Sequence, residues 1–336
     1  MWLRVEIEIT GASEVALDDF ACSFSSLGCC GISFDDDFEA TTDALQTGRR
    51  RLSLYFPLPP DREVPAKGDP LPSLRGESLL LDRIDTEIRS ARQIMDCAEI
   101  RVVTSESLAE EDWSASWKVH IKTKIVTPRI RVRPSWERVE GGSFPADIVI
   151  DPGMAFGTAD HATTALCLEA LDRLYTDPAT APANILDLGC GTAILAITAV
   201  KLGAKQGVAV DIDPYAVEAA KKNIAANGLS SKITTKEGTI DDVADPFDLI
   251  VANLTSGILL KLAKKLPTRL AGNGALVLSG FYGEEEERIR SAYGEVGFEP
   301  VWRGRRDEWS CLAMSRPGRS RFPGGTDRFR IENRKT

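Results

Sequence analysis

Two glycines and two carboxylates with the spacing of a nucleotide-binding turn lie between Ile185 and Asp211. An apolar run reaches Asp187, Gly189 and Gly191 follow, and a second apolar run ends at Asp211. Glycine has no Cβ, so the backbone can turn sharply and approach a ligand. A carboxylate after the second strand can hold both ribose hydroxyls. This pattern predicts a nucleoside-cofactor site at the carboxyl edge of a parallel sheet, with Gly189, Gly191 and Asp211 as cofactor-binding residues.

The details of the turn favour S-adenosylmethionine over a dinucleotide. A dinucleotide site needs a third glycine, because the pyrophosphate must reach a helix N-terminus. Ile194 stands at that position. Asp187 replaces the usual apolar residue, and its carboxylate could face the cationic amino-acid end of S-adenosylmethionine or orient the turn. A nicotinamide dehydrogenase and a tight turn without a ligand stay as alternatives.

A third polar group follows another apolar run, in the sequence VANLTSG. Asn253 ends this predicted strand and faces the same edge of the sheet. An amide oxygen there can accept a hydrogen bond from a target amine and aim its lone pair, as N-methyltransferases require. An asparagine that caps a helix is the structural alternative.

The segment DPGMAFGTADHATT precedes a predicted helix and contains the remaining polar candidates. We expect Thr163 or Thr164 to cap that helix, and the glycine-rich loop before it to cover the cofactor. Asp213, which precedes Pro214, is predicted to cap the helix after the second strand. A single histidine such as His161 is more often structural than catalytic, so no catalytic group is assigned.

Strands and helices alternate from Thr163 onward and would bring these residues together. The predicted fold is therefore α/β, with a doubly wound, parallel, Rossmann-like sheet. Strands are predicted at 184–188, 207–211, 249–253 and 275–279, and helices at 164–175, 193–201, 215–227, 256–266 and 284–295.

The first hundred residues show a different order of elements. Apolar residues alternate with charged ones in residues 2–10, which predicts a half-buried strand. The whole order reads βαββαβ, a small α+β ferredoxin-like domain. Further strands are predicted at 31–34, 51–56 and 99–103, and helices at 13–27 and 79–95.

Four segments follow from these patterns. We predict a ferredoxin-like substrate-recognition domain at 1–107, an interdomain linker at 108–145, a cofactor-binding domain at 146–316 and a basic, disordered tail at 317–336. Trp113 and Trp117 share one face of a predicted helix in the linker. A proline-rich connector, PLPPDREVPAKGDPLPSLRG, is predicted to be a mobile loop in the first domain.

Composition narrows the class of protein. The 336 residues are 43% hydrophobic and 27% charged, with a net charge of -9, which argues against a broad nucleic-acid-binding surface. The last 21 residues hold seven basic and two acidic side chains, so the tail is either a solvated appendage or a weak RNA or ribosome contact.

Cysteine spacing and hydropathy bear on location. The seven cysteines form no CxxC pair and no zinc spacing, so we predict reduced thiols, a cytoplasmic location and no bound metal. No apolar run reaches the roughly 18 residues that span a bilayer, so we predict no membrane association.

The four motifs DPGMAFGTADHATT, DLGCGTAILAI, AVDIDPYAV and VANLTSG together resemble the ribosomal protein L11 methyltransferase family. The resemblance runs from about Asp112 to about Met314 and includes the order and spacing of the motifs. This sequence differs from the family pattern at Ala159 and Ala193, where the family has glycine, and in Leu254-Thr255 after Asn253.

The resemblance implies an S-adenosylmethionine-dependent methyltransferase whose cofactor is contacted by Thr164, Gly189, Asp211 and Asn253. It implies that lysine side chains and the N-terminal amine of one ribosomal protein are methylated, and that the ferredoxin-like domain recruits this substrate. We expect a monomer. Methylation of another protein or a small molecule, and a non-catalytic cofactor-sensing module that binds ribosomes, stay as alternatives.

Overall fold

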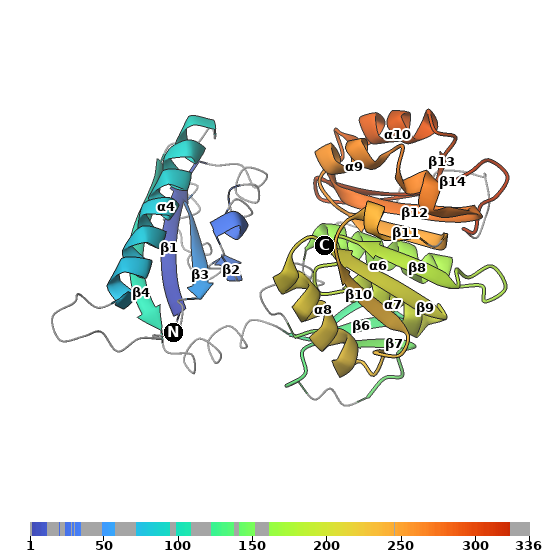
Figure 1. Ribbon diagram of the computed structural model, residues 1–336, viewed down its shortest axis with the longest axis horizontal. Helices are drawn as coiled ribbons and strands as arrows, with labels where there is room; N and C mark the ends of the chain where they lie inside the picture. Colours follow the sequence, from blue (N-terminus) through green and yellow to red (C-terminus); the bar gives the residue numbers. More distant parts are fainter. Residues whose placement is uncertain are drawn as a thin grey trace. The chain divides into compact units, whose positions relative to one another are not determined.

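The chain divides into two compact units, Met1–His120 and Ile121–Thr336 (Figure 1). The computed structural model describes residues 2–11, 20, 24–27, 29, 31–34, 49–57, 72–94, 99–108, 122–137, 141–151, 161–244 and 246–322. The predicted linker, 108–145, spans the division and includes strands of the second unit. Trp113 and Trp117 lie outside the described residues, so their shared helix face stays a prediction.

The first unit contains the elements β1 (Trp2–Thr10), η1 (Phe24–Leu27), β2 (Gly31–Phe34), β3 (Arg49–Pro57), α4 (Pro72–Ile94) and β4 (Glu99–Leu108). The second contains β5 (Lys124–Thr127), β6 (Ile130–Arg133), β7 (Ala146–Val149), α6 (Ala162–Leu174), β8 (Asn184–Leu188), α7 (Ile194–Leu202), β9 (Gln206–Asp211), α8 (Pro214–Ala226), β10 (Ile233–Glu237), η3 (Ile240–Asp242), β11 (Phe247–Asn253), α9 (Ser256–Leu262), η4 (Leu266–Arg269), β12 (Leu270–Tyr282), α10 (Glu286–Gly294), β13 (Glu299–Arg306) and β14 (Trp309–Ser315).

The first unit has the strand order of a ferredoxin-like fold. Its antiparallel sheet runs β2-β3-β1-β4, so the first strand lies between the third and the fourth. The apolar residues of β1 are fully buried with Ile84 and Ile88 of α4, which lies along one face of the sheet (Figure 1). The predicted α+β fold is confirmed. Most of the predicted helix 13–27 and of the predicted proline-rich loop lies outside the described residues.

The second unit is built on a seven-stranded sheet with the order β10-β9-β8-β11-β12-β14-β13. This confirms the doubly wound Rossmann-like prediction, with one correction. The sheet is not wholly parallel, because β14 runs antiparallel to both neighbours. The sequence analysis predicted neither this hairpin nor β10, whose residues ITTKE carry no apolar alternation.

Alternate residues of the central strands enter two separate cores. Leu249 and Val251 face one side of the sheet, and Ile250 and Ala252 face the other. Helices α6, α7 and α8 cover the first side, and α9 and α10 cover the second (Figure 1). Burial on both sides explains the continuous apolar runs of these strands. The turns after β8, β9 and β11 therefore meet at one edge of the sheet.

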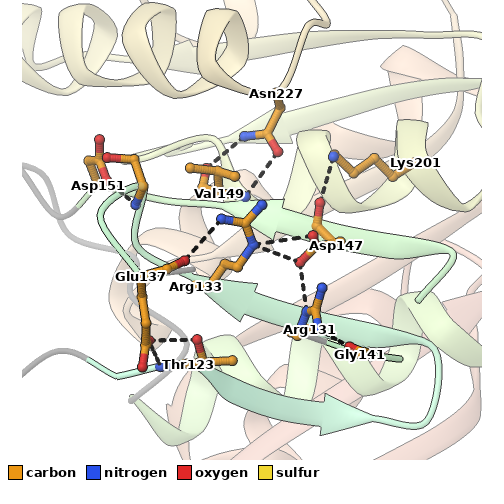
Figure 2. A network of polar contacts seen from close by, with 11 residues as sticks. Thr123, Arg131, Arg133, Glu137, Gly141, Asp147, Val149, Asp151, Lys201 and Asn227 are labelled. Carbon is orange, nitrogen blue, oxygen red and sulfur yellow. Dashed lines mark hydrogen bonds and ion pairs between the residues drawn. The ribbon is translucent and has the colours of Figure 1, made fainter. Parts of the chain in front are cut away.

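A small three-stranded sheet, β5-β6-β7, packs its apolar side against α6 and α7. Figure 2 shows its polar network: Arg131 and Arg133 both contact the carboxylate of Asp147, at 2.9 and 3.2 Å. Lys201 of α7 donates to the main-chain oxygen of Asp147 at 2.6 Å. These contacts fix the direction of β7, which leads into the loop before α6.

The beginning of the predicted tail packs against the second unit. Arg321 forms an ion pair with Asp248 at 3.0 Å, and it donates to the main-chain oxygens of Thr180 and Asn273. The ring of Phe322 stacks on Trp302 at 6.5 Å between centroids. Residues 317–322 therefore hold the amino-terminal edge of the sheet, and residues 323–336 lie outside the described part of the chain.

No helix within the described ranges is long and apolar enough to cross a membrane. Among the same residues, no group of three or more histidine, cysteine or acidic side chains could hold a metal ion.

Candidate functional site

The turn after β8 uses a left-handed backbone at three positions. Gly189, Gly191 and Ala193 have φ angles of 70°, 50° and 61°. A Cβ on Gly189 would lie 2.4 Å from Cδ2 of Leu254, which explains why that position needs glycine. The left-handed conformation costs about 1–2 kcal/mol for a residue with a Cβ, so Ala193 holds some backbone strain where the family has glycine.

Asp211 at the end of β9 holds the glycine turn. Its Oδ2 accepts from the main-chain nitrogen of Gly191 at 2.9 Å, and its Oδ1 accepts from that of Asp213 at 3.1 Å. Each carboxylate oxygen has two lone pairs, so acceptor capacity remains for ribose hydroxyls. Asp213 caps α8 by accepting from the nitrogen of Tyr215, which confirms the predicted cap.

Ile212, between these two acidic residues, is 74% exposed. The sequence analysis did not single it out, although an apolar residue directly after a ribose-binding carboxylate was a usable signal. Its exposed face beside Asp211 suits the flat, apolar surface of a nucleobase.

Asp187 is buried below the turn, with 1% of its surface exposed. Its Oδ2 accepts from the main-chain nitrogen of Ala196 in the first turn of α7, at 3.0 Å. Its Oδ1 has no hydrogen-bond partner among the described residues. Burial, followed by the nearby charge of Asp211, raises the pKa of Asp187 to about 8. Of its two predicted roles, the one that the contacts support is orienting the turn and the helix.

Replacing Asp187 with asparagine should change the pH dependence of stability. The pKa of this carboxyl group is about 3.9 in the unfolded chain and about 8 in the folded chain. At a pH between these two values, the group binds a proton in the folded state but not in the unfolded state. The free energy of unfolding of the wild type therefore includes a contribution that falls as the pH rises toward 8. Asp187→Asn has no proton to lose, so its stability relative to the wild type should increase between about pH 5 and about pH 9. Urea unfolding across this range measures the difference, and a constant difference would contradict the assignment.

Asn253 joins the end of β11 to the first turn of α6. Its Nδ2 donates to Oγ1 of Thr163 at 3.1 Å and to Oγ1 of Thr164 at 3.5 Å. Both threonines are 1% exposed. The fold thus brings together Asn253 and Thr164, which stand 89 positions apart in the sequence.

The predicted cap of α6 is wrong. The helix begins at Ala162, and the capping residue is His161, whose side chain accepts from the main-chain nitrogen of Thr163. The helix starts two residues before the predicted Thr164, and both threonine hydroxyls accept from Asn253.

His161 connects this group to an aromatic pair from β12 and β14. Its Nδ1 lies 2.7 Å from Oγ1 of Thr163, and its ring lies 5.0 Å from that of Trp309. Trp309 lies 4.3 Å from the ring of Tyr282. Burial lowers the pKa of His161, which favours the neutral ring. The sequence analysis missed both aromatic residues, because it did not predict β14. Residues 152–160 of the motif DPGMAFGTADHATT lie outside the described residues.

Comparison with known proteins now decides the family. The family model described as ribosomal protein L11 methyltransferase (PrmA) matches residues 1–317. The chain belongs to this family. It is 34% identical over 322 residues to a ribosomal protein L11 methyltransferase of Pelobacter propionicus, covering 95% of this chain and 99% of that one. A relative of the same name from Trichlorobacter lovleyi is 34% identical over 319 residues, which is 94% of this chain and 98% of that one.

A solved structure supports the fold of this family member. The ribosomal protein L11 methylase of Lactobacillus delbrueckii subsp. bulgaricus is 34% identical, with a TM-score of 0.54, and the match covers 58% of this chain and 98% of that chain. The chain is accordingly an S-adenosylmethionine-dependent methyltransferase of the ribosomal protein L11 type, as its motifs indicated.

Proposed function

We propose that the enzyme methylates lysine side chains and the N-terminal amine of ribosomal protein L11, with Asn253 as the group that receives the amine. The observation that carries this proposal is the orientation of the Asn253 amide. Its Nδ2 faces the hydroxyls of Thr163 and Thr164, which leaves Oδ1 as the acceptor for an N–H of the substrate. A hydrogen-bond acceptor at this place suits a substrate amine, which donates hydrogen bonds, better than it suits a substrate carboxylate, which only accepts them.

We propose Thr164, Gly189, Gly191, Asp211 and Asn253 as the residues that hold S-adenosylmethionine. Glycine suits position 189 in this site, because its φ is +70° and a Cβ there would displace the Leu254 side chain that packs on the turn. Asp187, buried below the turn, holds the first turn of α7 and so supports this site without contacting the ligand. Asp211 has acceptor capacity for the ribose, and Ile212 offers an apolar face.

The cofactor supplies an electrophilic methyl group on a positively charged sulfur. The chain's own contribution is to place the amine in line with that methyl group, and such alignment can lower a barrier by about 7–11 kcal/mol. An ammonium has no lone pair, and the pKa of a lysine is about 10.4 in water. Removal from water in the site lowers that pKa and favours the neutral amine, whose lone pair Asn253 aims by accepting an N–H. The displaced proton passes to water.

Transfer of labelled methyl from S-adenosylmethionine to purified ribosomal protein L11 tests the substrate. We expect label on the protein, and intact-mass analysis of ribosomal proteins from cells with and without the enzyme should show the same change. Labelling of other proteins only would favour a different substrate. Cofactor binding without any turnover would favour a non-catalytic module that binds ribosomes.

Asn253→Ala should reduce methyl transfer by about 100-fold, the scale of a misplaced reactant, while the chain stays folded. The loss should appear in kcat at saturating cofactor. Asn273→Ala is the matched control, since Asn273 is exposed at the start of β12; it should retain wild-type activity. Equal rates for the two variants would exclude the proposed role of Asn253.

We further propose that the enzyme works as a cytoplasmic monomer without membrane association, and that residues 317–336 make at most a weak contact with RNA. The six basic residues among 317–336 support that contact. Light scattering of the purified chain tests the monomer, and truncation after residue 322 tests the tail.

A further inference from the structure

Two asparagines, Asn223 in α8 and Asn227 at its C-cap, bind the main chain at and just after the end of β7. Asn227 accepts from the nitrogen of Val149 at 3.0 Å and donates to the oxygen of the same residue at 2.6 Å. Figure 2 shows this amide reaching from α8 to the strand. Asn223, one helical turn earlier, accepts from the nitrogen of Asp151 at 3.1 Å. The two side chains thus replace a neighbouring strand along this edge.

Asn223 makes a second contact that Asn227 lacks. Its Nδ2 donates to the main-chain oxygen of Thr192 at 3.3 Å. Thr192 belongs to the glycine turn, next to Gly191, whose N–H is held by Asp211. One amide, 2% exposed, therefore joins the glycine turn to Asp151. Asp151 is the last described residue before the segment that leads to α6 and Thr164.

We propose that Asn223 is a positioning residue for the cofactor, because it holds the glycine turn at Thr192 in a fixed position relative to the main chain at Asp151. This inference rests on the proposed cofactor site. The two groups that Asn223 binds are one main-chain oxygen and one main-chain N–H, and an amide is the neutral side chain that presents both a donor and an acceptor. Losing it leaves buried polar groups unpaired.

Asn227 provides the matched control for a purely structural role. It is the C-cap of α8, binds both main-chain polar atoms of Val149 and donates to the main-chain oxygen of Asn223 at 2.8 Å. The hydrogen bonds recorded for it do not reach the glycine turn. Asn227→Ala should therefore lower the melting temperature without weakening cofactor binding. Asn223→Ala should lower the melting temperature and also weaken cofactor binding.

The experiment measures binding of S-adenosylhomocysteine by calorimetry, and the kinetics of methyl transfer, with the full chain. We expect Asn223→Ala to weaken binding about ten-fold, which corresponds to one hydrogen-bond-sized loss. The KM for S-adenosylmethionine should rise by a similar factor, with kcat at saturating cofactor within about two-fold. Asn227→Ala should keep wild-type affinity within about two-fold.

Asn223→Asp provides a second readout if the alanine variant does not fold. A carboxylate retains the acceptor for Asp151 but cannot donate to Thr192, whereas a protonated carboxyl group can do both. The affinity of Asn223→Asp for S-adenosylhomocysteine, relative to the wild type, should therefore recover as the pH is lowered. Wild-type affinity in both Asn223 variants, or equal weakening by Asn227→Ala, would overturn the inference. A wild-type chain that binds no S-adenosylhomocysteine would instead overturn the proposed function.

Discussion

Replacing Gly280 with alanine is expected to lower the free energy of unfolding of the second unit by about 2–5 kcal/mol and to abolish most methyl transfer. Gly280 has a φ of +88°, and a Cβ there would lie 2.6 to 2.8 Å from main-chain atoms of Leu254. The left-handed backbone costs about 1–2 kcal/mol with a Cβ, and overpacking adds about 1–3 kcal/mol. The close atoms are backbone, so a side-chain rotation cannot relieve the contact.

The effect on activity follows from the position of Leu254. Its main-chain nitrogen donates to the oxygen of Ser279 at 2.9 Å, and its side chain lies over Gly189. Leu254 is therefore held between the turn that follows β8 and the end of β12. A displacement of its backbone would move Asn253, the preceding residue, away from Thr163 and Thr164.

Gly228→Ala is the matched control for this substitution. Gly228 also has a left-handed backbone, with a φ of +69°, but nothing lies within 4 Å of a Cβ built there. Gly228→Ala should lower the free energy of unfolding only by the cost of the left-handed backbone, about 1–2 kcal/mol. It should leave activity unchanged. Urea unfolding and the methyl-transfer assay measure both variants. Equal stability losses would show that Leu254 moves aside without cost.

The second large effect is expected at Glu286, at the start of α10. The carboxylate is 4% exposed and binds Arg303 at 3.1 Å and Arg305 at 3.0 Å. Ser310 donates to the same group at 2.9 Å. Burial raises the pKa of Glu286, but the hydrogen bonds from Ser310, Arg305 and Arg303 outweigh it and keep the pKa below its usual value. The carboxylate therefore stays charged in the interior.

Glu286→Ala should lower the free energy of unfolding by about 3 kcal/mol, the lower end for a broken buried pair, because it leaves the partly exposed guanidinium groups of Arg303 and Arg305 without a counter-charge. The stability that the carboxylate contributes should be lost as the pH falls, since its folded pKa is depressed. Glu287→Ala is the control. Glu287 pairs with Arg290 at 2.8 Å, but its side chain is 77% exposed, so its loss should cost about 0–1 kcal/mol. Similar losses for the two variants would mean that the Glu286 cluster adds no more than a surface ion pair.

Local patterns were sufficient for the elements and for the class of site. The strand at Asn184–Leu188, the glycine turn and the capping role of Asp213 depend on residues a few positions apart, so the sequence displays them directly. The same holds for the apolar runs within β9 and β11, residues 207–210 and 249–252, which are largely buried. The βαββαβ order of the first unit follows from alternation in the same way.

Contacts between distant residues could not be predicted in this manner. His161, rather than a threonine, caps α6, because the helix begins earlier than its apolar pattern indicates. Asp248 of β11 binds the main chain at Ala183 and Asn184 as well as Arg321, a contact that spans 73 positions. Edge strand β10 is polar, and polar edge strands have no distinctive periodicity.

The sequence by itself therefore determined the fold class, the family, and which residues border the cofactor turn, because each depends on short-range order along the chain. Only the tertiary structure decided how those residues are held. It placed Asp211 on the N–H of Gly191, turned Asn253 toward two threonine hydroxyls, and joined the glycine turn to β7 through Asn223. Hydrogen bonds of this kind depend on the distance and direction of groups that only folding brings together, so linear spacing carries no record of them.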